Sequence, residues 1–348
     1  MIVNRDRTGE KGCLRLSVII PTYNCEAYLD ECLASVLSQL PEDCELIAAD
    51  DGSTDGTAQL LAGYEGRREN LRILYCPHRG ASGARNAGLD AAAGEYVAFL
   101  DCDDCLRAGF FAESLPLLAQ GADLYIFGIE RVPLAGDPEA WTVEDRVFPD
   151  ASAFADAYVR TRRMLIYSNC NKFYRRRLIE AQGLRFAEDV SFGEDRLFNY
   201  RFLQGCGSIV TSGILMLRYL QRSLDSLSSR HIPDYFTRAL ALHRAKVESF
   251  LSLSRGTTGE ERRSFAARDL AAEIRGTVSR FGEHPEEAAE NMGAVNALIF
   301  SLLPGLEQLL REQGAVPPEE WYASEAAREL VLKELISVSL PYACQDSR

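Results

Sequence analysis

The first hundred residues alternate short apolar runs with segments whose apolar residues recur at helical spacing. Four strands are predicted by the apolar runs at 16–20, 45–49, 71–76 and 95–100. Helices are predicted at 26–39, after a capping sequence at 53–55, and after a loop at 80–83 that leads into an Ala-rich segment ending at Ala93. Nearly continuous apolar strands separated by helices are typical of a parallel sheet covered by helices on both faces. This part of the sequence therefore predicts an α/β fold.

Beyond residue 111 the pattern becomes less regular. A strand is predicted at 123–129, and the segment 132–150 is rich in loop-forming residues and contains three prolines. A helix is predicted at 194–203, and two short strands are predicted at 208–211 and 214–219. The α/β pattern thus continues to about residue 220.

The last third of the chain is predicted to be helical from about residue 233, with connectors at 254–260 and 282–287. Its most apolar stretch, at 293–306, is too short and too interrupted to span a bilayer. Burial in a core, a homodimer contact and a contact with a membrane surface remain open for it. The predicted domains are a polar tail at 1–15, an α/β domain at 16–230 and a helical region at 231–348.

Polar residues cluster where three of the early strands end. In α/β sheets, ligands bind beyond the carboxyl ends of the strands. The clusters are Pro21-Thr22-Tyr23-Asn24, Asp50-Asp51 and Asp101-Cys102-Asp103-Asp104. Because all three fall at one predicted edge of the sheet, we expect a shared binding site there.

The acidic cluster after the fourth strand carries the most specific chemistry. Side chains alternate along a strand, so Asp101 and Asp103 should point the same way. Three neighbouring carboxylates repel each other unless a cation or strong donors neutralise them. Carboxylates suit Mg²⁺ or Mn²⁺, which keep coordination positions open for phosphate oxygens. The cluster predicts a metal site for a diphosphate, and the alternative is a polar turn.

Arg85 and the pair Glu194 and Asp195 each have a structural and a functional interpretation. Arg85 either lies on the surface of a helix or pairs with a phosphate or an acid. Glu194 and Asp195 open the helix at 194–203, where the helix dipole favours acids. Alternatively, this pair supplies a general base that removes a proton from an incoming hydroxyl.

Composition narrows the class of partner. The chain has 348 residues and a formal net charge of −13, which argues against sequence-independent binding of nucleic acid. The first fifteen residues contain no apolar signal segment, so a cytoplasmic protein is expected, with a peripheral contact on the inner face of the membrane left open. The ten cysteines are scattered, which indicates reduced thiols. A local run of basic residues at 160–177 is either a solvated face or a site for an anionic acceptor or membrane.

Seven short motifs in this order resemble glycosyltransferase family 2, the nucleotide-sugar transferases with the GT-A fold. The resemblance covers about residues 16–229. Its motifs are Val18-Ile19-Ile20-Pro21-Thr22-Tyr23-Asn24, Asp50-Asp51-Gly52-Ser53-Thr54-Asp55, Ala84-Arg85-Asn86-Ala87-Gly88, Phe99-Leu100-Asp101-Cys102-Asp103-Asp104, Asn171-Lys172-Phe173-Tyr174-Arg175, Gly193-Glu194-Asp195-Arg196-Leu197-Phe198, and the segment from Tyr219 to Ser228.

The resemblance implies a role for each matching residue. Asp195, with Glu194, would be the catalytic base, and Asp103 would ligate a divalent metal, Mn²⁺ or Mg²⁺, with Asp101 between the ribose and the metal. Thr22 and Asp51 would contact the base and ribose of the nucleotide. The remaining implied contacts with the nucleotide sugar or the acceptor are Pro21, Tyr23, Asn24, Arg85, Lys172 and Arg222.

The implied reaction is the inverting transfer of a sugar from a nucleotide sugar, most often a UDP-sugar, to a hydroxyl of a glycan or lipid-linked glycan. Such enzymes serve the synthesis of bacterial cell-surface polysaccharides or glycoconjugates. A non-catalytic nucleotide-sugar-binding protein of the same fold is the main alternative. A haloacid-dehalogenase phosphatase would carry its Asp-x-Asp motif on an early strand, and a sugar nucleotidyltransferase would carry a Gly-rich N-terminal loop that is missing here.

This chain departs from the family pattern in three places. It has His78-Arg79-Gly80 where the family often has an asparagine before the Gly-rich loop. The segment from Tyr219 to Ser226 is one residue longer than the common pattern, which affects the assignment of Arg222. The region after Pro233 matches no motif of the family, and we expect it to support acceptor access or self-association.

Overall fold

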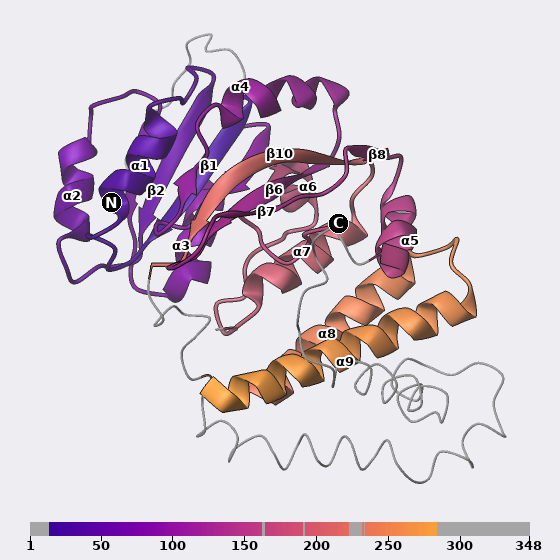
Figure 1. Ribbon diagram of the computed structural model, residues 1–348. Coiled ribbons are helices and arrows are strands. Elements are labelled where there is room, and N and C mark those ends of the chain that lie inside the picture. The colour runs from indigo at the N-terminus through magenta and orange to yellow at the C-terminus, as the bar shows by residue number, and fades with distance from the viewer. Residues whose placement is uncertain (1–13, 162–163, 191, 223–231, 233, 284–348) are drawn as a thin grey trace. The chain divides into compact units, whose positions relative to one another are not determined.

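The structure is a computed structural model that describes the chain except residues 1–13, 162–163, 191, 223–231, 233 and 284–348 (Figure 1). The chain divides into two compact units. The first unit comprises residues 1–150 and 164–223, and the second comprises residues 151–163 and 224–348. We describe each unit by itself.

A mixed sheet forms the centre of the first unit. Among the described residues its strand order is β3-β2-β1-β4-β9-β6-β10-β5, with β7 paired to β6 and β8 paired to β10. Strands β1 to β4 are parallel, and β9 is antiparallel to both β4 and β6. The strands are β1 Leu16–Thr22, β2 Cys44–Asp50, β3 Leu71–Tyr75, β4 Tyr96–Phe99, β5 Cys105–Leu106, β6 Leu124–Val132, β7 Glu139–Trp141, β8 Arg146–Phe148, β9 Lys172–Arg175 and β10 Ile209–Leu220.

Helices lie on both sides of this sheet (Figure 1). They are α1 Leu29–Leu37, α2 Thr57–Tyr64, α3 Gly80–Ala91, α4 Phe110–Ser114, the 3-10 helix Leu115–Gln120, α6 Arg176–Ala181 and α7 Glu194–Gln204. Every residue of β1 and β2 is buried, which explains why the sequence shows them as continuous apolar runs. The observed α/β architecture confirms the predicted fold class.

Several predicted boundaries were wrong. Helix α3 begins at Gly80, so the predicted loop at 80–83 is the first turn of the helix. The N-terminal cap of α2 is Gly56, not a residue of the segment 53–55. The two strands expected at 208–211 and 214–219 are one strand, β10, whose pairing with β6 is irregular between Thr211 and Leu215.

Other elements were missed because their stability comes from distant pairing. The segment 132–150, expected to be loop, contains β7 and β8, which pair with β6 and β10 respectively. Strand β9 was not predicted, and it joins the two halves of the sheet between β4 and β6. The helix α9, Gly259–Glu283, continues through the start of the connector predicted at 282–287, and the rest of that connector lies outside the described residues.

Two glycines bring α3 and its following turn against β1. A Cβ atom on Gly88 would lie 2.3 Å from Cγ2 of Ile19, and one on Gly94 would lie 2.5 Å from the backbone nitrogen of Ser17. Side chains at these positions would force α3 and β1 apart. The glycine of the Arg85-containing motif is thus required for packing.

A cluster of aromatic side chains packs against α7. Phe186 and Phe198 are stacked with ring centroids 4.2 Å apart and an interplanar angle of 3°. Phe99 packs edge-on against both rings, and Tyr174 packs edge-on against Phe198. Because Phe198 belongs to α7, this packing holds the N-terminus of α7, which carries Glu194 and Asp195.

The second unit consists, over its described residues, of α5 Ala151–Thr161, α8 Tyr235–Leu253 and α9 Gly259–Glu283. Tyr158 of α5 stacks on Phe250 of α8, with ring centroids 4.0 Å apart. The region after residue 231 is therefore helical as far as it is described, and α5 joins it from earlier in the chain. The apolar stretch at 293–306 lies outside the described residues.

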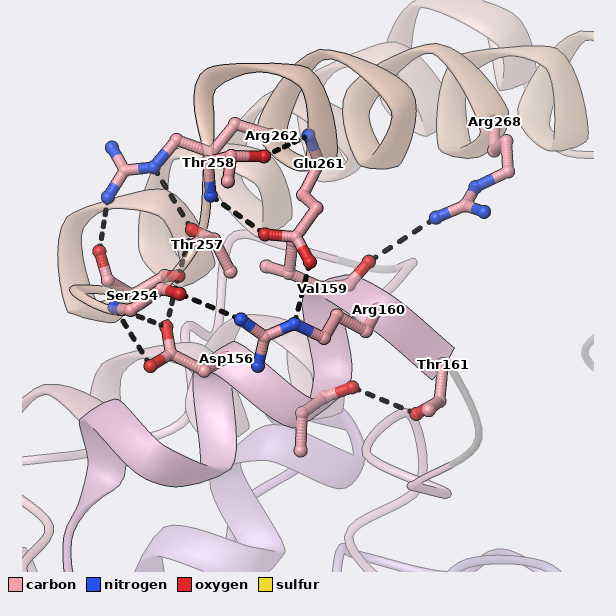
Figure 2. Close-up of polar contacts among 12 residues, drawn as sticks. Asp156, Val159, Arg160, Thr161, Ser254, Thr257, Thr258, Glu261, Arg262 and Arg268 are labelled. Atoms are coloured by element: carbon pink, nitrogen blue, oxygen red, sulfur yellow. Dashed lines mark hydrogen bonds and ion pairs between the residues drawn. The ribbon is translucent and has the colours of Figure 1, made fainter.

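Polar contacts hold α5 to the connector between α8 and α9 (Figure 2). Asp156 accepts a hydrogen bond from the Gly256 backbone at 2.9 Å, and Arg160 donates to the Gly256 carbonyl and to Glu261, each at 2.7 Å. Thr258 and Glu261 exchange side-chain-to-backbone hydrogen bonds in the arrangement of a capping box at the start of α9. No helix within the described part of either unit is long and apolar enough to cross a membrane.

Candidate active site

The carboxyl ends of β1, β2 and β4 meet at one edge of the sheet, as the sequence predicts. Thr22 at the end of β1 is aligned with Asp50 at the end of β2, and the Asp51 backbone donates to the Thr22 carbonyl at 2.9 Å. The segment after β4 is joined to β1 by a hydrogen bond from the Leu100 backbone to the Ile19 carbonyl at 3.0 Å. The acidic segment at 101–104 therefore follows directly on the same edge.

The segment after β1 is tied to the segment after β2. Asn24 has a positive φ of 46°, and its side-chain oxygen accepts hydrogen bonds from the Thr54 backbone at 2.8 Å and the Asp55 backbone at 3.4 Å. Pro21 is buried inside β1, and Thr22 is buried with its hydroxyl 3.4 Å from a carboxylate oxygen of Asp50. Pro21, Thr22 and Asn24 thus shape this edge of the sheet.

Asp51 contacts His78, which lies in the segment between β3 and α3. The Asp51 carboxylate accepts hydrogen bonds from the backbones of Arg79 at 2.7 Å and Gly80 at 2.8 Å. Its Oδ2 also lies 2.8 Å from Nδ1 of His78, whose ring stacks on Tyr23 with centroids 4.5 Å apart. In the sequence, His78 is visible only as a departure from the family pattern, which predicts no role for it.

The segment at 101–104 is a turn, because β4 ends at Phe99 and the Asp104 backbone donates to the Asp101 carbonyl at 3.1 Å. The expectation that Asp101 and Asp103 share a direction through strand alternation was therefore based on the wrong local structure. Asp104 is buried and accepts a hydrogen bond from the Leu220 backbone at 2.9 Å. Burial, with repulsion from Asp103 and Asp101, raises the pKa of Asp104 to about 9.

Arg85 links this turn to the distant acid pair on α7. Its guanidinium donates to Asp101 at 2.9 Å and to Glu194 at 3.0 Å, and it lies 5.4 Å from the centre of the Phe186 ring. The Arg85 side chain is 7% exposed. Arg85 therefore acts within the site as a bridge between acids, which differs from the helix-surface interpretation.

Asp195 lies at the N-terminus of α7, directly after Glu194. The helix is preceded by Gly193, whose φ is 81°, a backbone conformation that favours glycine. Burial, followed by repulsion from Glu194, raises the pKa of Asp195 to about 6. A carboxylate with a pKa in this range is suited to accept a proton near neutral pH.

Asn86 holds the segment that leads into α7. Its side-chain amide donates to the Phe186 carbonyl at 2.9 Å and accepts from the Phe186 backbone at 2.8 Å. In the sequence, Asn86 is a capping-type residue placed inside a predicted helix, but its partner lies a hundred residues away. Asn86 thus places Phe186 beneath Arg85.

The structure gives Lys172 an internal role. Its side chain is fully buried, and the amine donates to Asn171 Oδ1 at 2.6 Å, to the Leu165 carbonyl at 2.8 Å and to the Ser168 carbonyl. An ammonium group has three donors, and these three oxygens use all of them. Burial lowers the pKa of Lys172 to about 7. All three donors of Lys172 are thus used inside the protein, which leaves none for the implied contact with the nucleotide sugar or the acceptor.

Arg222 lies beside the acidic turn. It donates to the Asp103 carbonyl at 2.6 Å and to Glu31 of α1 at 2.8 Å, and its guanidinium is 4.7 Å from the centre of the Tyr28 ring. Of the three predicted cations, Arg85 and Arg222 are thus brought to the acidic turn. Glu31, which the sequence did not single out, orients Arg222.

The basic run at 160–177 does not form one unpaired patch over the residues that the structure describes. Arg160 pairs with Glu261 in the second unit (Figure 2). In the first unit, Arg175 pairs with Glu95 and Asp123, and Arg176 pairs with Glu180. The basic residues at 162 and 163 lie outside the described residues.

The acids at the turn fit a divalent cation that takes further ligands from a substrate. No group of three or more His, Cys, Asp or Glu side chains in the described residues is arranged to hold a metal ion by itself. Burial of the carboxylate, followed by repulsion from Asp101, raises the pKa of Asp103. Diphosphate oxygens and water can complete the coordination of Mg²⁺ or Mn²⁺.

Comparison with known sequences identifies related proteins. Residues 17–183 match the sequence model described as "Glycosyl transferase family 2". The uncharacterised glycosyltransferase EpsJ of Bacillus subtilis (strain 168) is 31% identical over 53% of this chain and 54% of its own length. The putative teichuronic acid biosynthesis glycosyltransferase TuaG of the same organism is 46% identical over 32% of this chain and 45% of its own length. The chain thus spans about half the length of these relatives.

Solved structures show the same fold. The structure of S. aureus TarS residues 1–349 in complex with UDP-GlcNAc aligns with a TM-score of 0.61 at 22% sequence identity. The alignment covers 93% of this chain and 90% of that chain. The likeness extends the fold beyond the residues that the family model matches.

Proposed function

This chain belongs to glycosyltransferase family 2, and from that premise we propose that it is an inverting, metal-dependent transferase that moves a sugar from a UDP-sugar to a hydroxyl group. The observation that carries the proposal is the double contact of Arg85 with Asp101 and Glu194. The Arg85 guanidinium joins the acidic turn at 101–104, where the diphosphate would bind, to Glu194, whose neighbour Asp195 would accept the proton of the acceptor hydroxyl. This contact supports the proposal because the transfer needs a cation site for the diphosphate and a base for the acceptor close together.

Asp103, with Asp101, is the group we propose to hold the divalent cation. A bound cation would supply stabilisation for the negative charge that grows on the leaving diphosphate. Arg222 lies on the Asp103 carbonyl and adds positive charge beside the same turn. Arg85 fixes the Asp101 carboxylate, so the acid beside Asp103 has one orientation when the donor arrives.

Asp195 is the group we propose to accept the proton of the acceptor hydroxyl. The hydroxyl oxygen forms a bond to the anomeric carbon, the bond from that carbon to the diphosphate breaks, and the proton passes to Asp195. A single displacement of this kind inverts the configuration at the anomeric carbon. Glu194 holds Arg85, and its charge helps to keep the pKa of Asp195 near the value that a general base needs.

The choice of donor and acceptor class is supported by relatives. The TarS structure contains UDP-GlcNAc, and a curated relative in Staphylococcus aureus is named poly(ribitol-phosphate) beta-N-acetylglucosaminyltransferase TarS. TuaG is named for teichuronic acid biosynthesis. We therefore propose a hexosyl or N-acetylhexosaminyl donor and a cell-surface glycan or lipid-linked glycan as acceptor. A homodimer or a peripheral membrane contact remains a prediction for the second unit.

Calorimetry of UDP binding tests the proposal. The protein is titrated with UDP in Mn²⁺ and in EDTA, and Asp103→Asn is compared with Asp137→Asn, which removes an exposed carboxylate from a loop. We expect UDP to bind the unchanged protein and Asp137→Asn with Mn²⁺, and to bind weakly in EDTA or with Asp103→Asn. Equal UDP affinity in EDTA would contradict the metal site. Metal-dependent binding without hydrolysis or transfer of any UDP-sugar would favour a non-catalytic binding protein.

A further inference from the structure

Trp141 places an exposed aromatic ring on the second half of the sheet. It belongs to β7 and is 40% exposed. A Cβ atom on Gly128 of β6 would lie 2.9 Å from the Trp141 carbonyl oxygen, so the missing side chain at Gly128 lets the Trp141 backbone approach β6 this closely. The ring is therefore carried by a backbone that is held against the sheet, while the ring itself stays accessible to solvent.

Polar groups border this ring. The Arg131 guanidinium lies 5.9 Å from the centre of the Trp141 ring. It donates to Glu139 at 3.4 Å and to Gln221 at 3.2 Å, and these two contacts orient it. A flat apolar ring bordered by hydrogen-bonding groups suits a sugar residue, whose C–H face stacks on the ring while its hydroxyls take the hydrogen bonds.

Strand pairing connects Trp141 with the acidic turn at 101–104 (Figure 1). Trp141 pairs with Ile129 of β6, and Ile129 pairs with Leu217 of β10. Leu217 in turn pairs with Leu106 of β5, the strand that follows directly on the acidic turn. Three interstrand steps of about 4.8 Å separate Trp141 from Leu106, which gives about 14 Å across the sheet.

The end of β10 supplies a second connection to the same turn. Gln221, which accepts a hydrogen bond from Arg131, is followed by Arg222, which donates to the Asp103 carbonyl at 2.6 Å. In the strand order, β4 and β9 separate β6 and its partner β7 from β1, β2 and β3. Trp141 thus lies in the half of the sheet away from the strands that we assign to the nucleotide.

We propose that Trp141 and Arg131 form a subsite for a sugar residue of the acceptor glycan, at least one residue removed from the sugar whose hydroxyl reacts. The inference rests on the transferase function proposed above and assigns a distal acceptor contact within it. The chemistry fits β-linked sugars of the gluco configuration, because their equatorial hydroxyls leave C–H groups on both ring faces for stacking. A span of about 14 Å requires an oligosaccharide, since a single sugar cannot reach both the ring and the acidic turn.

Tryptophan fluorescence reports this contact directly. The chain contains two tryptophans, Trp141 and Trp321, so Trp141 is the only one left in a Trp321→Phe protein. This protein is titrated with chitotetraose and with cellotetraose. We expect a blue shift of the emission and protection from acrylamide quenching, because a stacked sugar excludes water from the ring. The same response is expected with UDP and Mn²⁺ present, since the donor binds elsewhere.

Calorimetry measures the contribution of the ring to affinity. Trp141→Ala should raise the dissociation constant of chitotetraose by about tenfold, the scale of one aromatic stacking contact. Trp141→Tyr keeps an aromatic ring and should stay within about threefold of the unchanged protein. Val147→Ala is the matched control, because Val147 is 62% exposed and lies on β8, where it pairs with Val210. It should leave the affinity for chitotetraose unchanged, and all three variants should bind UDP in Mn²⁺ as the unchanged protein does.

Equal affinity of Trp141→Ala and the unchanged protein for chitotetraose would overturn the inference. An emission spectrum that neither glycan alters at millimolar concentration would do the same. Loss of the glycan response when UDP and Mn²⁺ saturate the protein would place Trp141 in the donor site and would also contradict it. Self-association that Trp141→Ala abolishes in sedimentation experiments would show that the ring contacts a second copy instead. A glycan response without metal-dependent UDP binding would refute the proposed function and, with it, the assignment of this glycan as an acceptor.

Discussion

Arg85 and Glu194 lie 109 residues apart in the chain, yet Nη1 of the guanidinium donates to Oε1 of the carboxylate at 3.0 Å. The same guanidinium holds Asp101 through its other terminal nitrogen. The distance between the acidic turn and α7 is thereby set by one planar group. Preorganisation of this kind matters because a displacement needs both ends of the reacting system in place at once.

Replacement of Arg85 by lysine should disrupt this spacing. A lysine ammonium is a single point charge and cannot hold two carboxylates in the fork geometry of arginine. We expect Arg85→Lys to lower kcat/KM for sugar transfer by at least about tenfold, the scale of one lost charge-assisted hydrogen bond. Steady-state kinetics with a transferred UDP-sugar measures the effect.

Arg177→Lys is the matched control, because the Arg177 side chain is 71% exposed and its acid contact is long, at 3.5 Å. It should leave kcat/KM unchanged. An Arg85→Lys enzyme that is folded and fully active would show that the two acids keep their places without the bridge.

The pH dependence of transfer should report Asp195. Its pKa is raised from 3.8 to about 6, and the base must be ionised to accept a proton. Transfer should therefore be constant at neutral pH and fall tenfold per pH unit below about pH 6. A pH–rate profile of kcat at saturating donor and acceptor measures this. A profile that stays flat to pH 4.5 would mean that another group takes the proton.

Asp195→Asn should lose activity and gain stability. Removal of a general base costs about 10²–10⁴-fold in rate, and UDP binding should be retained. Because the pKa of Asp195 is raised in the folded protein, the folded state resists ionisation, and its stability falls as pH rises through about 6. Asparagine cannot ionise, so thermal unfolding at pH 7.5 should occur at a higher temperature. Asp189→Asn, at an exposed position, should change neither quantity.

The strands and the polar clusters at their ends could be predicted, because they follow from local sequence patterns. The clusters at Thr22, Asp51 and Asp101 could be placed at one edge because each lies at the end of a strand whose residues are mostly apolar. Lys172 could not be placed, since two of its acceptors, the carbonyls of Leu165 and Ser168, lie in a segment with no recognisable pattern. The pairing of His78 with Asp51 also could not be predicted from the sequence. The segment after β3 brings the two residues together only in the folded chain.

Lys172→Met tests the structural role now assigned to that residue. Methionine fills a similar volume but removes the donor of the Asn171 side-chain oxygen, while the Leu165 and Ser168 carbonyls keep longer hydrogen bonds from Asn171 and Asn199 at 3.4 and 3.2 Å. An unpaired buried acceptor costs about 1–3 kcal/mol, so the free energy of unfolding should fall by about that amount. Urea unfolding measures the loss, with the exposed Arg177→Met as control. The folded fraction should bind UDP with unchanged affinity, and a selective loss of UDP affinity would restore Lys172 to the binding site.

Gly88→Ala should separate the packing role of the Arg85-containing motif from its chemical role. The added methyl group would lie 2.3 Å from Cγ2 of Ile19, well inside contact distance, so α3 and β1 must move apart. Overpacking of this kind costs about 1–3 kcal/mol, and the movement carries Arg85, three residues earlier on α3.

Gly63→Ala in α2 is the matched control, because its nearest neighbour is the end of the Arg67 side chain at 3.8 Å. We expect Gly63→Ala to be neutral or slightly stabilising and Gly88→Ala to lower both the unfolding temperature and kcat. An unchanged unfolding temperature for Gly88→Ala would show that α3 does not pack on β1 as closely as the structure indicates.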